Sequence, residues 1–217
     1  MTSGLGLRER KKQQTRLQIA ETARRLFLER GFEAVSVAEV ARETDVSVGT
    51  VFNYFPTKED LFYSGMDVFE ARLLDGVRER PAGESVLAAF RRVVLDGIPR
   101  LALDETVDLI AMAARIVGSS RSLQAREREI VAQYTAQLAA LIAEETRRSV
   151  DDVEAATVAA ALMGAQRALV AYVHAGVLAG RRGPKLASGA RSQAKRGFAR
   201  LEQGLGDFAV RRDSASH

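Results

Sequence analysis

The chain has 217 residues, of which 47% are hydrophobic and 28% charged, a composition that suits a folded protein with a buried core. The absence of cysteine excludes disulfides, thiolate nucleophiles and cysteine-ligated metal sites, and it fits a reducing compartment. Imidazole is available only at His174 and at the terminal His217, which leaves little for a histidine metal site or a catalytic dyad. We therefore expect no metal, no cofactor and no enzymatic activity.

The net charge of +4 permits a polyanionic partner without requiring one. Basic residues are concentrated in two places. Residues 181–200 hold seven basic residues and no acidic one, and they are either an anion-binding patch or the solvated face of an exposed helix. Within residues 1–16 a single acid, Glu9, accompanies five basic residues: Arg8, Arg10, Lys11, Lys12 and Arg16.

Two segments of the sequence bear on membrane insertion, and neither predicts it. The N-terminal residues are charged and lack an apolar segment, so we expect no secretory signal and a cytoplasmic protein. Residues 155–180 exceed the roughly 20 residues that a membrane span needs. Ten of them are alanine, however, and an arginine near the middle of a span costs about 2.5–3.5 kcal/mol. We expect this segment to be a buried helix of a soluble protein.

Long segments rich in Ala, Leu, Arg, Glu and Gln predict an all-α fold. Prolines separate these segments at positions 56, 81, 99 and 184. The first predicted helix, residues 8–30, has one apolar face and ends at Gly31. Beyond Pro56 the sequence predicts a bundle of helices at residues 58–78, 84–97, 105–117, 120–148, 150–179 and 188–208.

Capping signals predict two short helices between residues 36 and 55. Ser36 and Glu39 match a capping box, in which each side chain accepts a hydrogen bond from the other residue's amide. This first helix is short because Asp45 follows after little more than two turns. Ser47 is a favoured N-cap for the second helix, which must end before Pro56. Two short helices joined by a tight turn form a helix-turn-helix, a motif that reads DNA in the major groove.

The apolar residues of this segment are spaced to pack inward. The small side chain of Ala41 allows the two short helices to cross closely. Val46, Val51 and Phe55 are expected to pack onto Val37 and Val40 and onto the first long helix through Phe27 and Phe32. Small or hydrogen-bonding residues remain for the outward face, namely Val48, Gly49, Thr50, Asn53 and Tyr54. A capped helical hairpin within a bundle is the structural alternative.

The same residues resemble the DNA-binding segment of the TetR/AcrR family of bacterial regulators. The likeness rests on Gly31-Phe32, on Ser36-Val37-Ala38-Glu39-Val40-Ala41, and on residues 46–61, which read VSVGTVFNYFPTKEDL. Beyond them only chain length and helical character agree. Asp45 stands at a position where the family has a turn glycine with positive φ, which Asp tolerates. Phe52 stands where the family frequently has tyrosine. The hydroxyl that would contact a phosphate is therefore missing at this position, and Tyr54 can supply one instead.

The resemblance implies a helix-turn-helix domain at residues 1–57 and a helical regulatory domain at residues 58–217. It implies a homodimer that binds a palindromic double-stranded DNA operator and a small-molecule effector. No membrane is expected among its partners. Thr50 and Asn53 would contact base edges and Val48 a thymine methyl. For Thr57 a purely structural role is the alternative, because it can cap the next helix. The DNA contacts that we expect are Arg8, Lys11, Lys12, Ser36, Val37, Ser47, Val48, Gly49, Thr50, Asn53, Tyr54, Thr57 and Lys58.

Members of this family dimerise through their last two long helices and enclose the effector between the others. Residues 155–180 supply small side chains for close helix packing, and residues 188–208 supply a second interface helix. Candidate effector contacts are Met66, Phe69, Phe90, Met112, Arg115, Tyr134, Met163, Gln166 and Arg167. The methionines and aromatic residues can equally be core filler. The polar residues can equally be exposed or paired with Asp108 or Glu154, and His174 is expected to be a core or interface residue.

We therefore predict a ligand-responsive repressor. A DNA-binding regulator without an effector, or an architectural DNA-binding protein, is the alternative. A helical-bundle enzyme and a partner-binding scaffold are more distant possibilities. The sequence contains no phosphate-binding glycine loop, no HExxH pair and no serine nucleophile elbow, which argues against an enzyme.

Overall fold

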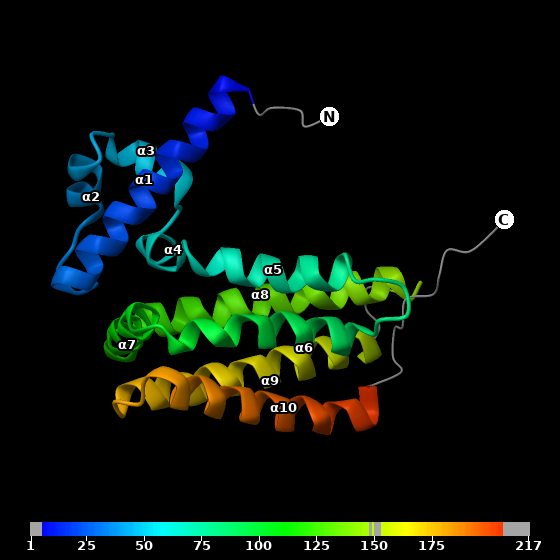
Figure 1. Cartoon of the computed structure of the whole chain (residues 1–217). Coiled ribbons are helices and arrows are strands. Elements are labelled where there is room, and N and C mark those ends of the chain that lie inside the picture. Colours follow the sequence, from blue (N-terminus) through cyan, green and yellow to red (C-terminus); the bar gives the residue numbers. More distant parts are fainter. Residues whose placement is uncertain (1–5, 148, 150–152, 206–217) are drawn as a thin grey trace. The chain divides into compact units, whose positions relative to one another are not determined.

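The computed structural model describes residues 6–147, 149 and 153–205, and all regular elements in these ranges are helical (Figure 1). The chain divides into two compact units. The first comprises Met1–Asp67 together with Ile116–Arg126, and the second comprises Val68–Arg115 together with Glu127–His217. The first unit thus reaches further than the expected boundary at residue 57, and it takes in a distant segment of the chain.

The first unit contains helices α1 (Leu7–Arg30), α2 (Val37–Glu43), α3 (Val48–Tyr54) and α4 (Lys58–Tyr63). Ile116–Arg126 adds the end of α7 (Asp104–Ser119) and the beginning of α8 (Arg121–Glu145). Three phenylalanines meet in its core, with ring centroids 5.2 Å apart for Phe27 and Phe32 and 5.9 Å apart for Phe32 and Phe62. Val40, Val51 and Phe55 are buried with them, as predicted from their spacing.

Side-chain caps start the short helices at the predicted residues. Ser36 and Glu39 form a reciprocal capping box at α2, and Ser47 accepts from the amide of Thr50 at the start of α3. Thr57 and Asp60 form a second capping box at α4. Gly31 ends α1 with φ of +85°, and Asp45 adopts φ of +54° in the turn, as expected from the glycine that it replaces. These local predictions are confirmed.

The second unit packs α5 (Met66–Arg78), α6 (Val86–Gly97), α9 (Val153–Leu178) and α10 (Gly183–Leu205) with the remainders of α7 and α8. Helices α5, α6, α8, α9 and α10 run lengthwise in the view of Figure 1, and α7 is seen nearly end-on. Helix α10 packs on α9, α6 and the 3-10 helix Ile98–Ala102. The rings of Phe90 and Phe198 meet in the core, 6.1 Å apart.

The largest differences from the predicted helix bounds concern two helices. The expected helix 58–78 is broken into α4 and α5, because Ser64 Oγ donates to the carbonyl of Leu61 at 2.9 Å and is followed by Gly65, a poor helix former. Helix α10 begins at Gly183 rather than at residue 188, since Pro184 lacks an amide hydrogen and fits the first turn. The predicted end of that helix, residues 206–208, lies outside the described residues.

Helix α9 is long and apolar enough to cross a membrane by length and composition alone. One third of its most apolar window is buried, whereas the core helix of a soluble protein, which passes the same test, is mostly buried. Ten of its residues are buried, among them Leu162, Leu169 and Val173. The helix packs against α10 and α6, and most of its apolar window is not buried within the described part of this chain.

Candidate nucleic-acid interface

Helix α3 turns one side into the core of the first unit and exposes the other. Val51 is fully buried, which fixes the rotation of the helix about its axis. Val48 is 40% exposed and Phe52 is 44% exposed. Gly49 and Asn53 are also exposed, whereas Thr50 and Tyr54 are half-buried. The exposed side thus combines two apolar side chains with the amide of Asn53, which can both donate and accept hydrogen bonds.

Phe52 belongs to this surface, although sequence reasoning treated it only as a lost hydroxyl. Residues four apart lie on the same side of a helix, so Val48 and Phe52 form one exposed apolar strip. Their spacing was visible in the sequence. It could not be assigned to solvent until the burial of Val51 fixed which side of α3 faces the core.

The N-cap of α3 engages two of the predicted contacts with each other. Ser47 Oγ accepts from the amide of Thr50 at 3.0 Å, and the hydroxyls of Ser47 and Thr50 lie 2.8 Å apart. Thr50 is therefore oriented by the cap and keeps only part of its hydrogen-bonding capacity for another molecule.

The residues of α2 and α4 and their caps that were predicted to contact DNA phosphates have structural roles in the first unit. Ser36, which is exposed, donates its amide hydrogen to Glu39 Oε2 at 2.8 Å, and Val37 is half-buried. The hydrogen bond from the Ser36 amide lowers the pKa of Glu39. The hydroxyl of Ser36 and the charge of Arg30 lower this pKa further. Thr57 is exposed beside α4 as its N-cap.

Lys58 extends over aromatic rings of the core. Its Nζ lies 4.2 Å from the ring centroid of Phe32 and 6.0 Å from that of Phe27, in cation–π geometry. The side chain is half-buried. To bind a phosphate, the ammonium group of Lys58 would therefore have to leave the ring of Phe32 or bind the phosphate while it stays at the rim of that ring.

The N-terminal basic cluster is helical, as predicted for residues 8–30. Arg8, Lys11 and Lys12 are exposed on the first turns of α1. Arg16, one turn further on, is half-buried, with its guanidinium carbon 5.0 Å from the ring centroid of Phe55. With Arg10, which is also exposed, the arrangement places four exposed cations on a helix of the unit that carries α3.

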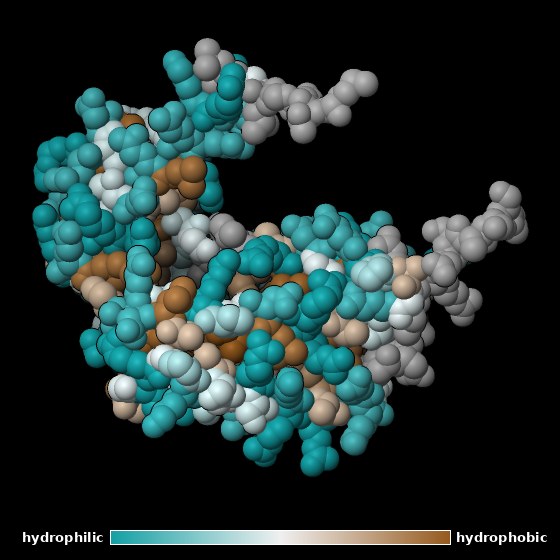
Figure 2. Space-filling view, viewed as in Figure 1, coloured by the Kyte–Doolittle hydropathy of each residue, from teal (hydrophilic) through white to brown (hydrophobic). Residues whose placement is uncertain are grey.

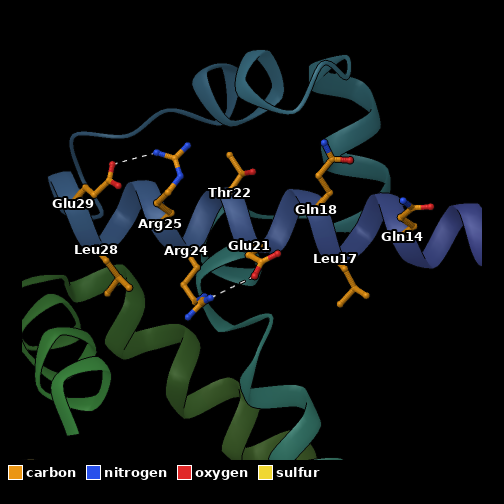
Figure 3. A pocket seen from close by; sticks show the side chains of 9 residues that line it. All are labelled: Gln14, Leu17, Gln18, Glu21, Thr22, Arg24, Arg25, Leu28 and Glu29. Atoms are coloured by element: carbon orange, nitrogen blue, oxygen red, sulfur yellow. Dashed lines mark hydrogen bonds and ion pairs between the residues drawn. The ribbon is translucent and has the colours of Figure 1, made fainter. Parts of the chain in front are cut away.

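An open groove of about 820 Å³ runs along the same helix, and all of its lining residues come from α1 (Figure 3). Two rows of side chains border it, one led by Gln18, Thr22 and Arg25 and the other by Leu17, Glu21 and Leu28 (Figure 3). Leu17 is 65% exposed, and ion pairs join Arg25 to Glu29 and Arg24 to Glu21. Because a single helix supplies every wall, we interpret this groove as a surface feature and not as a ligand cavity.

The second basic cluster lies mostly on the solvent side of α10. Arg182 is paired with Asp108 at 2.6 Å, and Arg181 lies over the ring of Tyr172. In Figure 2, hydrophilic atoms cover much of the lower edge, where α10 lies in Figure 1. Five cations are exposed and form no ion pair within the part of the chain that the structure describes: Lys185, Arg191, Lys195, Arg196 and Arg200.

The candidate effector contacts are distributed over five helices of the chain. Phe90 and Met163 are buried in the core of the second unit, and Phe69, Met112 and Tyr134 are half-buried. Arg115 and Arg167 are exposed. The side chain of Met66 lies outside the described residues.

Gln166 is the one polar candidate that the structure buries. It is 8% exposed, and its Oε1 has no hydrogen-bond partner within the described ranges. His174 follows two turns later, is half-buried, and has a lowered pKa because burial disfavours its charged form, against a smaller opposite effect of Glu127. A second groove, of about 730 Å³, lies between α9 and α10, and none of the candidate effector contacts lines it.

Comparisons with known proteins identify the first unit. The profile of the family described as "Bacterial regulatory proteins, tetR family" matches residues 19–64. The transcriptional regulator TcmR from Streptomyces glaucescens is 30% identical over 145 residues, which are 60% of this chain and 64% of TcmR. The aligned part thus spans less than two thirds of that relative.

Two solved structures share the fold. FadR from Bacillus subtilis, in complex with stearoyl-CoA, gives a TM-score of 0.53 at 19% identity, covering 84% of this chain and 97% of FadR. NalD, the secondary repressor of the MexAB-OprM multidrug efflux pump in Pseudomonas aeruginosa, gives 0.51 at 18% identity, covering 90% and 98%. The curated relatives are named as regulators and not as enzymes, in agreement with the sequence prediction. The profile match places a DNA-binding domain of the TetR family of bacterial regulators at residues 19–64, and the chain shares its all-α fold with these structures over most of its length.

Proposed function

We propose that the protein is a cytoplasmic, homodimeric repressor that binds a palindromic operator and is released from it by a small-molecule effector. One observation carries the DNA-binding part of this proposal. Helix α3 is anchored by the buried Val51 and capped by Ser47, and it exposes Val48, Phe52 and Asn53 together. A short, rigid helix with such a face suits the major groove, whose base edges carry sequence information.

In this proposal the exposed side of α3 reads bases. The amide of Asn53 pairs with the edge of an adenine, and Val48 and Phe52 contact thymine methyl groups. Gly49 leaves room for close approach, and Thr50 contributes the hydrogen-bonding capacity that its contact with Ser47 leaves open.

Phosphate contacts surround this helix. Arg8, Lys11 and Lys12 supply exposed positive charge from α1. The amides and hydroxyls at Ser36, Val37, Ser47 and Thr57 supply neutral donors, joined by Tyr54 and Lys58. Positive charge contributes most of the sequence-independent affinity, whereas neutral donors fix the orientation on the duplex.

The dimer in this proposal forms through α9 and α10. The solvent side of α9 carries small residues, which allow two helices to approach closely: Ala156, Ala160, Gly164, Ala168, Ala171 and Ala175. The 730 Å³ groove between α9 and α10 has an apolar floor that includes Leu169, Tyr172 and Phe198. A two-fold pair would present two copies of α3 to two half-sites of a palindrome.

The effector in this proposal binds within the second unit. Support comes from the buried, unpaired Oε1 of Gln166, since an unsatisfied buried acceptor destabilises the free protein and is relieved by a ligand that donates a hydrogen bond. Phe69, Met112 and Tyr134 would supply apolar contacts, with Phe90 and Met163 behind them. The solved FadR complex contains stearoyl-CoA, so long-chain acyl compounds are the first ligands to test.

DNA binding is tested by gel shift on genomic fragments, including the DNA upstream of the protein's own gene. We expect one fragment to bind far more tightly than the rest. Asn53→Ala should weaken binding to that fragment by about 1–3 kcal/mol and leave non-specific binding unchanged. Lys58→Ala should weaken both and reduce the salt dependence. Uniformly weak binding to every fragment would contradict the proposal.

Effector binding is tested by thermal stabilisation. A ligand at 100 times its dissociation constant should stabilise the protein by about 2.7 kcal/mol through mass action. Gln166→Leu should raise the stability of the free protein and reduce the ligand-induced gain. The proposal also requires that the ligand, at the same concentration, releases the bound DNA fragment. Stabilisation without this release would favour the effector-independent alternative.

A further inference from the structure

The segment Ile116–Arg126 lies far from the helix-turn-helix in sequence and belongs to the same compact unit. Three of its residues bond to the elements around α3. Ser120 Oγ donates to Glu33 Oε1 at 2.8 Å, ahead of α2. Leu123 accepts through its carbonyl from the buried hydroxyl of Tyr63 at 3.0 Å. Arg126 bonds to Asp60 in α4.

The contact between Arg126 and Asp60 uses two donors. Arg126 Nε lies 2.8 Å and Nη2 lies 2.7 Å from Asp60 Oδ1. The side chains are 30% and 15% exposed, so water screens this ion pair less than it screens a surface pair. This contact between α8 and α4 combines an ion pair with a short hydrogen bond between opposite charges, which is the stronger class of hydrogen bond.

The second carboxylate oxygen of Asp60 has a different role. Oδ2 accepts from the amide of Thr57 at 3.0 Å, and the amide of Asp60 donates to Thr57 Oγ1 at 3.1 Å. Asp60 thereby closes the capping box of α4 with one oxygen and holds Arg126 with the other. Only Phe55, Pro56 and Thr57 separate this helix from α3.

We infer that Arg126 is a positioning residue for DNA binding. It acts through Asp60, by holding the first turn of α4 and thus the end of α3 in the orientation that presents Asn53, Thr57 and Lys58. This inference rests on the proposed function, and it adds to the DNA-binding machinery a residue that lies 66 positions from its partner. Arg126 itself does not touch DNA in this view.

The test compares Arg126→Gln with Arg121→Gln by titrating the tightly bound genomic fragment and a non-specific fragment at several salt concentrations. Arg121 is exposed on the first turn of α8 and has no ion pair within the described residues, so its substitution removes the same charge as a matched control. Active fractions are measured first by stoichiometric titration, which separates loss of affinity from loss of folded protein.

We expect Arg126→Gln to weaken binding to the specific fragment by about tenfold, the size typical of a lost charge-assisted hydrogen bond, and Arg121→Gln by less than about twofold. The salt dependence should stay unchanged, because no phosphate contact is lost. Asp60→Asn, which keeps a capping oxygen, should weaken binding similarly, and the double variant should be no worse than either single variant.

Three results would overturn the inference. A reduced salt slope in Arg126→Gln would show a direct phosphate contact. An unchanged dissociation constant with a smaller active fraction would show a role in folding alone. Equal behaviour of Arg126→Gln and Arg121→Gln, while Asn53→Ala still loses specific binding, would sink the positioning role and leave the proposed function standing. A wild-type chain that binds no fragment would end both.

Discussion

Arg80 is the largest side chain that the structure buries almost completely, and its replacement should destabilise the second unit strongly. Only 1% of the side chain is exposed. Its Nη1 donates to the carbonyl of Val77 at 2.7 Å and its Nε to that of Glu84 at 3.0 Å, and Nη2 is ion-paired with Glu145. One guanidinium therefore joins the turn after α5 to the last residue of α8.

The magnitude follows from what Arg80→Met leaves behind. Methionine fills much of the same volume, so little apolar packing is lost, but two carbonyls and a carboxylate that is 23% exposed lose their donor. Breaking a buried ion pair from one side costs about 3–5 kcal/mol. For a protein of this size such a loss corresponds to a decrease of roughly 6–20 °C in Tm.

The assay is urea unfolding at pH 7 followed by circular dichroism at 222 nm, at fixed protein concentration. Arg78→Met is the matched control. Arg78 lies two residues earlier and pairs with Asp75 at 3.0 Å, but both side chains are more than half exposed, so we expect a loss below about 1 kcal/mol. In the double variant with Glu145→Gln the losses should fall short of their sum. Equal unfolding midpoints for Arg80→Met and Arg78→Met would refute the reasoning.

Three further predictions concern caps, turns and pH. Ser47→Ala should lower the free energy of unfolding by about 1 kcal/mol, measured in urea, and weaken specific DNA binding because Thr50 loses its anchor. Asp45→Val should lower Tm clearly, since a β-branched residue resists φ of +54°, whereas Asp45→Gly should not. Burial lowers the pKa of His174, so the folded protein binds fewer protons than the unfolded chain below about pH 6.5. Stability should thus fall between pH 7.5 and 5.5, and His174→Gln should remove that fall; an unchanged slope would exclude His174 as its source.

The sequence was informative wherever the controlling interaction spans three or four residues. Ser36 with Glu39, Ser47 with Thr50 and Thr57 with Asp60 are all separated by three positions, and each cap lies where the spacing predicts it. The same holds for Asp45, whose positive φ is a property of one residue in one turn. Such interactions form in the isolated segment, so the residues alone specify them.

Helix ends that depend on packing were less predictable. The composition of residues 58–78 favours one continuous helix, and a single hydroxyl bond from Ser64 together with Gly65 divides it. Conversely, Pro184 was interpreted as part of a loop and instead lies in the first turn of α10. Local propensity allows a helix or a loop at both positions. At Pro184 the helix is favoured because Leu186, Ala190 and Phe198 of α10 are buried where this helix packs on α9 and α6.

The same reasoning explains why a site defined by motif alone is incomplete. Asp60 is recognisable from the sequence as a capping residue, because its partner Thr57 lies three positions away. Nothing in the residues around Arg126 distinguishes it from the exposed Arg121 or Arg128 on the same helix, since its environment is created only when α8 meets α4. A mutational survey confined to residues 19–64, the part that the family profile covers, would therefore find Asp60 sensitive and attribute the whole effect to helix capping. Because Asp60→Asn retains the capping oxygen and loses the ion pair, a defect in that variant would direct attention to a partner outside the motif.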